Sequence, residues 1–217
     1  MKKLIIMIAV AVFAISADAQ SRYCLTYKEF CNNTWHELDT LSVTLRSKNN
    51  QKWWGGNGYS FSAGNKDIDR TLKKEAFVVM LGDTLYINCR NLRYQGCPLG
   101  SGYTKVRRIG NRSLLLVNRL IGKDVEEKQA KSGFMLGFVG GIIIVSREKI
   151  CPVCYVVSNG TNKKGKIDIR LVNDDLISQM LKDQGPLFAE YFSEDDEIVR
   201  ISASHVLPIL EKSGLIK

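Results

Sequence analysis

The stretch AFVVMLGDTLYIN, residues 76–88, indicates the type of fold. AFVVM and LYIN are short runs rich in apolar and β-branched residues, which favour strands. Gly82-Asp83 stands between them, and such a pair is typical of a tight hairpin turn. Because strands joined by a tight turn run antiparallel, this stretch predicts an antiparallel sheet.

The same pattern recurs along the chain. YTKVRRI and SLLLVN flank Gly110-Asn111 as a second hairpin, and CYVVS and KIDIRL flank the polar loop NGTNKKG as a third. LSVTLR, residues 41–46, alternates apolar and polar side chains as a half-buried strand does. We therefore expect residues 20–172 to form an antiparallel β-rich domain of about seven strands, curved or closing toward a barrel.

Residues 173–217 change to the periodicity of helices. A second helix should follow the break at Gly185-Pro186, and a third should run over about 194–212. Pro208 should kink this third helix or start a new one. These helices would cover one sheet face, which makes the fold α+β; the alternative is that they dock a partner protein. The first of these helices precedes Gly185-Pro186, and its apolar face comprises Leu176, Ile177, Met180 and Leu181.

The N-terminus, MKKLIIMIAVAVFAISADAQ, has the pattern of a secretory signal peptide. Lys2 and Lys3 precede the apolar run 4–15, and the A-x-A signal at 17–19 predicts removal of residues 1–19. The alternative, a retained membrane anchor, would need an apolar run of about 20 residues, and this one is shorter. The sequence therefore predicts an exported protein.

The net charge restricts the partners of such a protein. Loss of the leader removes two Lys and one Asp, which changes the formal charge from +9 to +8. Outside the cell interior, anionic lipid head groups or acidic glycans fit this charge better than nucleic acid. Solubility alone is the other explanation.

Six cysteines follow the leader, an even number that would permit three disulfides in an exported chain. A zinc site is disfavoured because CPVC, residues 151–154, is the single CxxC motif. A redox dithiol needs a helix after the motif, whereas YVVS predicts a strand. The cysteines are Cys24, Cys31, Cys89, Cys97, Cys151 and Cys154.

The stretch SGFMLGFVGGIIIVS, residues 132–146, has glycines four residues apart at Gly133, Gly137 and Gly141. A helix over about 124–146 would place them on one face, where another backbone can pack closely. That partner would be the protein's own sheet, another subunit or a membrane. The competing structure is a helix followed by a strand IIIVS, since the isoleucines favour strand.

Two further stretches are candidates for ligand binding. Trp53, Trp54 and Tyr59 in WWGGNGY could stack on sugar rings, or could instead plug one end of the sheet. In KVRRIGNR, Arg107 and Arg108 should face opposite sides of a strand. A solvated sheet edge is the interpretation we favour there, and an anion site is the alternative.

No strong catalytic motif is present in the sequence. Three adjacent carboxylates, residues 195–197, point in different directions on a helix and suit its N-terminus better than acid–base catalysis. His205 has no obvious catalytic partner in the sequence. We therefore expect a protein that is not an enzyme and uses no cofactor or metal.

Four segments, WWGGNGY, LYINCRNLRYQGC, VNRLIGK and PILEKSGLI, resemble a family of small exported Bacteroidetes proteins of unknown function. The resemblance covers most of the chain after the leader. It implies the periplasm or outer membrane of a Gram-negative bacterium. In that phylum Asp-Thr followed by an apolar residue can be O-glycosylated, which makes Thr40 and Thr84 candidate sites.

The sequence therefore favours a non-enzymatic envelope protein over the other two hypotheses. Its glycine-rich segment would support self-association, contact with another envelope protein or contact with a membrane. The alternative is a glycan- or lipid-binding module that uses the aromatic cluster. A thiol–disulfide oxidoreductase using CPVC is a third hypothesis.

Overall fold

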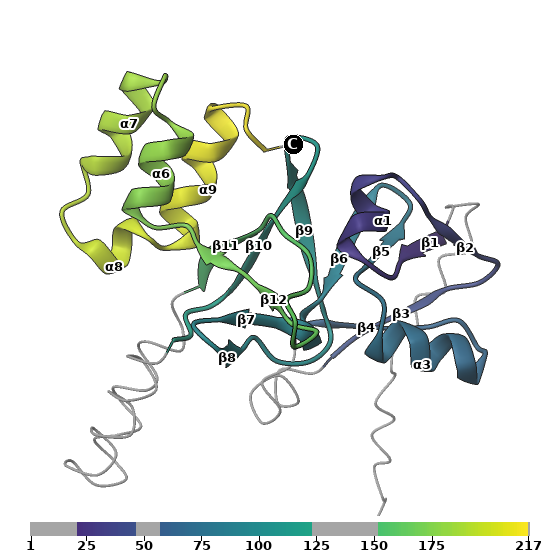
Figure 1. The fold of residues 1–217 in the computed structure, drawn as a ribbon. Helices are drawn as coiled ribbons and strands as arrows, with labels where there is room; N and C mark the ends of the chain where they lie inside the picture. The colour runs from purple at the N-terminus through teal and green to yellow at the C-terminus, as the bar shows by residue number, and fades with distance from the viewer. Residues whose placement is uncertain (1–20, 47–56, 123–151, 217) are drawn as a thin grey trace, which may run out of the picture.

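The computed structural model describes residues 21–46, 57–122 and 152–216 (Figure 1). Its main sheet has ten strands in the order β13-β11-β10-β9-β6-β5-β1-β2, and β4 joins β3 to β9. The strands are β1 (Ser21–Cys24), β2 (His36–Leu38), β3 (Ser42–Leu45), β4 (Tyr59–Ser62), β5 (Val78–Leu81), β6 (Thr84–Asn88), β9 (Tyr103–Ile109), β10 (Ser113–Arg119), β11 (Pro152–Val157) and β13 (Arg170–Leu171).

The α+β class and the antiparallel sheet are confirmed, but the predicted closure toward a barrel is wrong. Every pair of neighbouring strands in the main sheet is antiparallel. The two ends of the strand order, β13 and β2, do not pair with each other. Helices and a second small sheet cover the two faces of this open sheet.

Two predicted hairpins are present. β5 and β6 pair up to Leu81 and Thr84 around Gly82, whose φ of 56° suits a glycine. β9 and β10 pair up to Ile109 and Ser113 around Gly110, which also has a φ of 56°. Local turn chemistry therefore determines both connections.

The third predicted hairpin is different. The stretch KIDIRL forms two short strands, β12 (Ile167–Asp168) and β13, and only β13 pairs with β11. β12 runs parallel to β7 (Leu92–Tyr94), which also pairs with β8 (Cys97–Pro98) in a separate three-stranded sheet. Ile167 and Ile169 are both buried, and the chain leaves the main sheet so that they reach the core beneath it.

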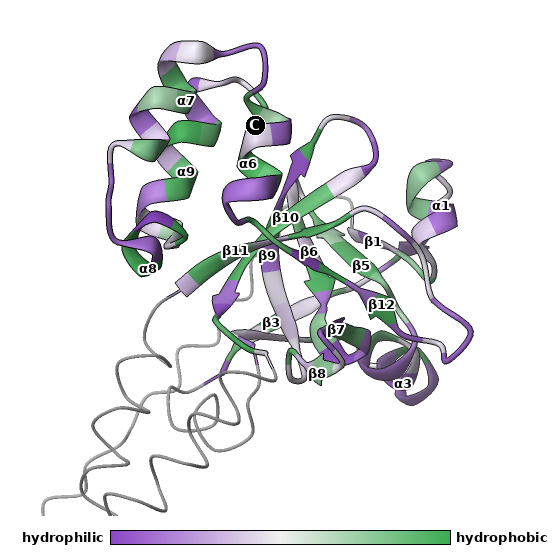
Figure 2. Cartoon of the chain, turned by 60° about the vertical axis from the view of Figure 1, so that its left-hand side comes forward, coloured by the Kyte–Doolittle hydropathy of each residue, from purple (hydrophilic) through white to green (hydrophobic). Residues whose placement is uncertain are grey.

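Alternation along the strands separates two cores. On the inner face, Leu114, Leu116 and Tyr155 pack under the small sheet and α1 (Tyr27–Cys31). On the outer face, Leu115 and Cys154 pack against the C-terminal helices. These helices are α6 (Asp174–Met180), α7 (Gly185–Phe192), α8 (Glu197–Arg200) and α9 (Ala203–Lys212). In Figure 2 the mainly hydrophobic β10 and β11 lie beside this helical layer.

The far half of the outer face has its own cover. α3 (Lys66–Lys74), together with β3 and β4, packs over Val79, Tyr86 and Tyr103. β3 is more exposed than its alternating sequence suggests, since Leu45 is 69% exposed. The sheet thus carries two separate layers on one face, with β9 between them.

The third predicted C-terminal helix is divided, but not at Pro208, which lies inside α9. The break comes earlier, at Ile201–Ser202, where Ser202 forms an isolated β-bridge with Val153. Contact with the sheet therefore ends α8 before the proline is reached.

Several sequence predictions concern residues outside the described ranges. These are the leader, the glycine-rich segment with Gly133, Gly137 and Gly141, the pair Trp53 and Trp54, and Cys151. Among the residues that the structure does describe, no helix is long and apolar enough to cross a membrane.

Candidate anion-binding cleft

A cleft of about 510 Å³ opens at the end of the main sheet where the C-terminal tail meets β9. β9 pairs with β6 as far as Val106 and Leu85, and next contacts the tail through the Ile109–Ile216 bridge. Arg107 lies in the interval between these two pairings, and so does Arg108. The cleft is therefore a gap in the sheet; Figure 1 shows the C-terminus beside the tip of β9.

Arg107 and Arg108 leave β9 on opposite faces, as their alternation predicts. Arg107 pairs with Glu211 of α9 on the outer face. The guanidinium of Arg108 lies 4.8 Å from the centre of the Phe30 ring, which belongs to α1 on the inner face. The charge of Arg107 is therefore already balanced by a carboxylate, whereas Arg108 is held by an aromatic ring.

Arg22 of β1 contacts the wall of the cleft but is not among the residues that line it. Its Nε donates to Sδ of Met80, a residue of the cleft wall, over 3.2 Å. Its guanidinium lies 4.9 Å from the centre of the Trp35 ring. Phe30 and Trp35 pack edge to face at 6.3 Å, so one aromatic pair supports both arginines.

Among the described residues, no carboxylate lies within ion-pair distance of Arg22 or Arg108. Asp83, at the rim, is the acid that lines the cleft. Glu29 is engaged elsewhere, since its Oε2 accepts from the Leu25 amide at 2.7 Å and lies 3.4 Å from His36 Nε2. The two guanidinium groups therefore keep donors available for a ligand.

The thiol of Cys24 shows that both charges act on the same place. Burial and, after it, the charge of Glu29 raise its pKa to about 12. The charges of Arg22 and Arg108 both act in the opposite direction, because each favours a nearby anion. The charges of Arg22 and Arg108, from two strands that are far apart in sequence, thus both reach Cys24, as does the stronger opposing charge of Glu29.

This arrangement is suited to binding an anionic group on a partly apolar molecule. A guanidinium that stacks on a ring through its face still presents N–H donors at its edge, which bind carboxylate or phosphate. Leu85 and Val106 give the cleft an apolar wall. The cleft volume lies in the range of small-molecule sites, roughly 300–1,000 Å³.

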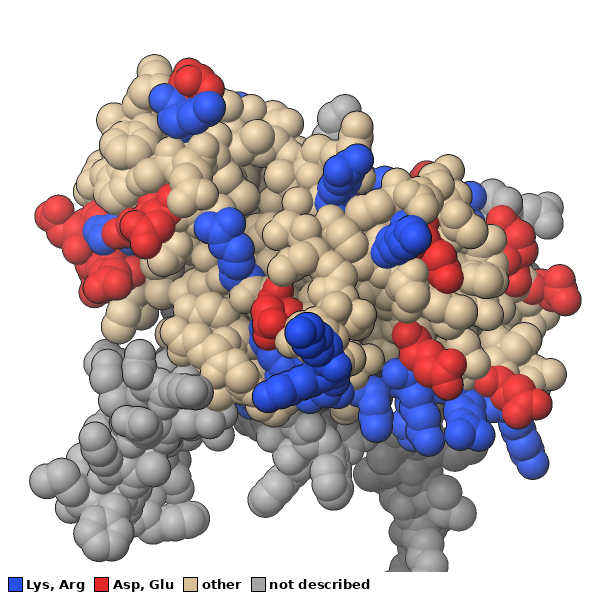
Figure 3. Space-filling view, viewed as in Figure 1, with Lys and Arg blue, Asp and Glu red and all other residues tan. Residues whose placement is uncertain are grey.

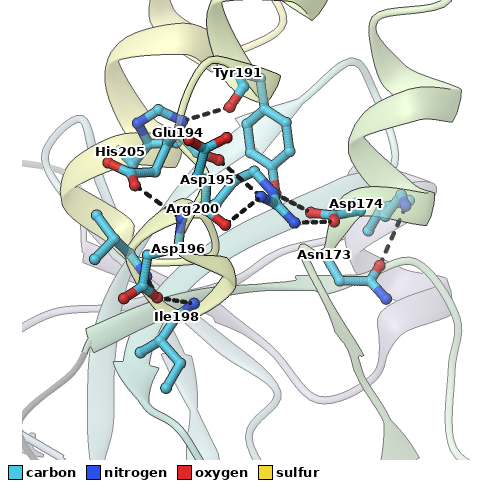
Figure 4. A network of polar contacts seen from close by, with 11 residues as sticks. Asn173, Asp174, Tyr191, Glu194, Asp195, Asp196, Ile198, Arg200 and His205 are labelled. Carbon is cyan, nitrogen blue, oxygen red and sulfur yellow. Dashed lines mark hydrogen bonds and ion pairs between the residues drawn. The ribbon is translucent and has the colours of Figure 1, made fainter.

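A second polar cluster lies in the helical layer, and its charged groups bind one another (Figure 4). Arg200 donates to both carboxylate oxygens of Asp174, from Nε at 3.0 Å and from Nη2 at 2.7 Å. The Tyr191 hydroxyl donates to the same carboxylate at 2.9 Å. The hydrogen bond from Arg200 lowers the pKa of Asp174. This cluster joins α6, α7 and α8 and is a structural element.

The three adjacent carboxylates serve the helix end as expected from their spacing. Asp196 caps α8 by accepting from the amides of Ile198 and Val199 at 2.8 and 3.2 Å. The ring nitrogen Nε2 of His205 lies 2.9 Å from the Tyr191 carbonyl oxygen. Neither group faces a described cavity lined by other catalytic side chains.

Four of the cysteines, Cys24, Cys31, Cys89 and Cys154, are free thiols, so no disulfide joins any two of them. Burial raises the pKa of Cys154 to about 12. Cys154 lies within β11, not at a helix N-terminus, as the sequence YVVS predicts. A thiol in this environment is a poor nucleophile.

The remaining predicted site residues lie apart from the cleft wall or at its edge. Tyr59 packs edge-on against Tyr86 at 5.1 Å, within the outer core. The Thr40 hydroxyl donates to the Ala63 carbonyl at 3.0 Å, and Thr84 begins β6 beside Asp83. The structure therefore does not bring Tyr59, Thr40 and Thr84 together.

In the sequence, KVRRIGNR points to Arg108, but nothing points to Arg22, Met80, Phe30 and Trp35. No local pattern signals their meeting, because they come from four separate elements or loops. In the described ranges no cluster of His, Cys, Asp and Glu could hold a metal ion.

Comparison with known proteins identifies a family without assigning an activity. No curated protein and no solved structure matches the chain. One family model matches residues 22–217, which is nearly the whole chain, and its description gives no function. The predicted membership of an uncharacterised family is thereby confirmed: the chain belongs to the family of unknown function DUF6563.

Proposed function

We propose that this protein is an exported, non-enzymatic protein of the Gram-negative envelope that binds an anionic ligand in the cleft between Arg22 and Arg108. Export rests on the leader pattern of residues 1–19. Binding rests on one observation: both guanidinium groups are positioned by aromatic rings and neither has a carboxylate partner among the described residues.

The ligand is defined by a single carboxylate or phosphate group on a compact body. Two guanidinium groups supply the charge, and the wall of Leu85, Val106 and Met80 accepts an apolar surface. A uronic acid from an acidic glycan and the phosphate head of a lipid both have this chemistry. The cleft therefore replaces the aromatic cluster as the centre of the glycan- or lipid-binding hypothesis.

Isothermal titration with three probes tests this function: inorganic phosphate, glucuronate and dihexanoyl phosphatidic acid. We expect at least one probe to bind, and Arg22→Gln and Arg108→Gln to weaken its binding about tenfold each, the loss of one charged hydrogen-bond donor. Arg112→Gln is the matched control, because Arg112 lies at the exposed hairpin tip outside the cleft wall. Equal affinity in all three variants would refute the site.

The ratio of the affinities for glucuronate and for dihexanoyl phosphatidic acid distinguishes an acidic glycan from a lipid as the source of the ligand. A W53F/W54F background leaves Trp35 as the single tryptophan, and its fluorescence should change on binding because Arg22 covers its ring. If W53A/W54A abolished binding while Arg108→Gln left the affinity unchanged, the aromatic cluster and not the cleft would be the binding site.

The glycine spacing carries a second proposal, self-association through Gly133, Gly137 and Gly141. Sedimentation of G133I/G137I tests it. A lower oligomer size than that of the natural chain is expected, and an unchanged size would exclude this mode of association.

A further inference from the structure

α3 carries a stripe of four cations on its solvent side. Lys66, Arg70, Lys73 and Lys74 are all exposed, and their spacing of four, seven and eight residues from the first places them on one helical face. The opposite side packs on the sheet through Leu72. Figure 2 shows α3 as a mainly hydrophilic helix, and the spacing of its cations places them on one face of it.

Two other segments extend the stripe. Asn88 donates to the Leu72 carbonyl at 3.1 Å, which holds the short 3₁₀ helix η1 (Cys89–Asn91) and the exposed Arg90 beside the end of α3. Lys166 Nζ donates to Asn91 Oδ1 at 3.0 Å, which brings the loop with Lys163 and Lys164 to the same place. We define the basic face as the α3 stripe with Arg90, Lys163 and Lys164.

The cations of the basic face have no ion-pair partner in the part of the chain that the structure describes. Asp69 on α3 is used internally, since it accepts from the Ser62 hydroxyl and the Ala63 amide. Asp168 accepts from the Asn162 amide group. Asp67 and Glu75 are the exposed acids of α3 and its cap, and the cations outnumber them.

The helical layer has the opposite charge. Residues 173–216 contain nine Asp or Glu and three Lys or Arg. Figure 3 shows basic side chains projecting along the lower edge of the molecule, over β12 and α3, with acidic side chains above them, and a further acidic group over the helical layer. The helical layer is therefore acidic, whereas the side chains that project from the lower edge are basic.

We infer that the basic face docks on the head groups of an anionic lipid bilayer, with the helical layer turned away from it. Cations that project from one edge in the same direction can all meet a flat surface. The acidic layer is repelled by the same surface, which selects one orientation. This contact is separate from the arginine cleft and does not depend on the proposed function.

Sedimentation of the full chain with sucrose-loaded vesicles tests the contact. Vesicles of equimolar phosphatidylcholine and phosphatidylglycerol should bind the protein, and vesicles of phosphatidylcholine alone should not. Binding should weaken about fivefold for each cation removed, so the triple variant K73Q/K74Q/R90Q should bind about a hundredfold more weakly. The control R112Q/R170Q/K182Q removes three exposed charges elsewhere and should bind as the natural chain does.

Added salt should release the natural chain from the vesicles, because exposed charges are screened. Equal weakening by both triple variants would overturn the inference, since total charge and not the basic face would then decide binding. Retention on heparin without any vesicle binding would also overturn it in favour of an anionic polymer. K73Q/K74Q/R90Q should leave the affinity of the cleft for glucuronate unchanged, because none of these three residues lines the cleft, which separates this contact from the cleft.

Discussion

Arg200 in the helical layer and the pair Arg22 and Arg108 in the cleft are held in similar ways but have different partners. All three guanidinium groups lie over an aromatic ring, at 5.6 Å for Arg200 and at 4.9 and 4.8 Å for the pair. Arg200 also binds Asp174 through two hydrogen bonds. The pair has no such carboxylate in the described ranges.

This difference separates a structural arginine from one that is available to a ligand. Arg200 has its charge balanced inside the fold, and its side chain is 14% exposed. Removing its partner would leave a charge that the fold cannot solvate well. Arg108 lines the cleft and Arg22 contacts its wall residue Met80, and neither pairs with a described carboxylate, so their removal should cost the fold little.

The largest expected effect is on ligand binding in the double variant R22Q/R108Q. Two charge-assisted contacts are lost, so affinity for the best probe should fall about a hundredfold. The melting temperature should stay within about 2 °C of that of the natural chain, since neither residue neutralises a buried acid. Titration calorimetry and thermal unfolding of the same preparation measure both quantities. Equal losses of stability and affinity would mean that the pair is structural as well.

The complementary variant, Asp174→Ala, removes the carboxylate partner of Arg200. It leaves Arg200 without its carboxylate and Tyr191 without its acceptor, and the melting temperature should fall by about 5 °C. Ligand affinity in the cleft should not change, because neither Asp174 nor Arg200 lines the cleft. Tyr191→Phe, which removes one of the three hydrogen bonds to the carboxylate, should show a smaller fall. An unchanged melting temperature in Asp174→Ala would show that the cluster does not stabilise the fold.

Acid should remove the same stabilisation from the natural chain. The folded protein holds the pKa of Asp174 below its usual 3.8, so the carboxylate stabilises the fold above that pH. This contribution is lost as the pH falls through the lower folded pKa. The gap in unfolding free energy between the natural chain and Asp174→Ala should therefore close in acid, as followed by denaturant titrations from pH 6 downward. A gap that widens on acidification would contradict the sign of the shift.

The smallest expected effect concerns the ring beneath Arg22. Trp35→Leu removes the stacking surface but leaves the charge, so affinity should fall about threefold. Restoration by Trp35→Phe would support stacking as the cause. If Trp35→Leu abolished binding as fully as R22Q/R108Q, the ring itself and not the arginines would hold the ligand.

Local patterns predicted the parts of this fold whose determinants lie within a few residues. Gly82 and Gly110 each adopt a positive φ at a hairpin turn, and both turns follow from the sequence. α3 was missed because its apolar side is short, although the Asn65 cap accepts from the amides of Asp67 and Ile68. The cleft was not predicted: the sequence favours a solvated sheet edge at Arg107 and Arg108, with an anion site as the alternative.

By itself, the sequence determined the strand alternation, the two tight hairpins and the helical periodicity near the C-terminus, because these depend on neighbours along the chain. Tertiary structure alone decided that the sheet stays open and that KIDIRL divides between two sheets. It also decided which arginine lacks a carboxylate partner among the described residues: Glu211 neutralises Arg107, whereas Arg108 lies over the ring of Phe30. Such partners come from separate elements, and only packing of the two faces brings them together.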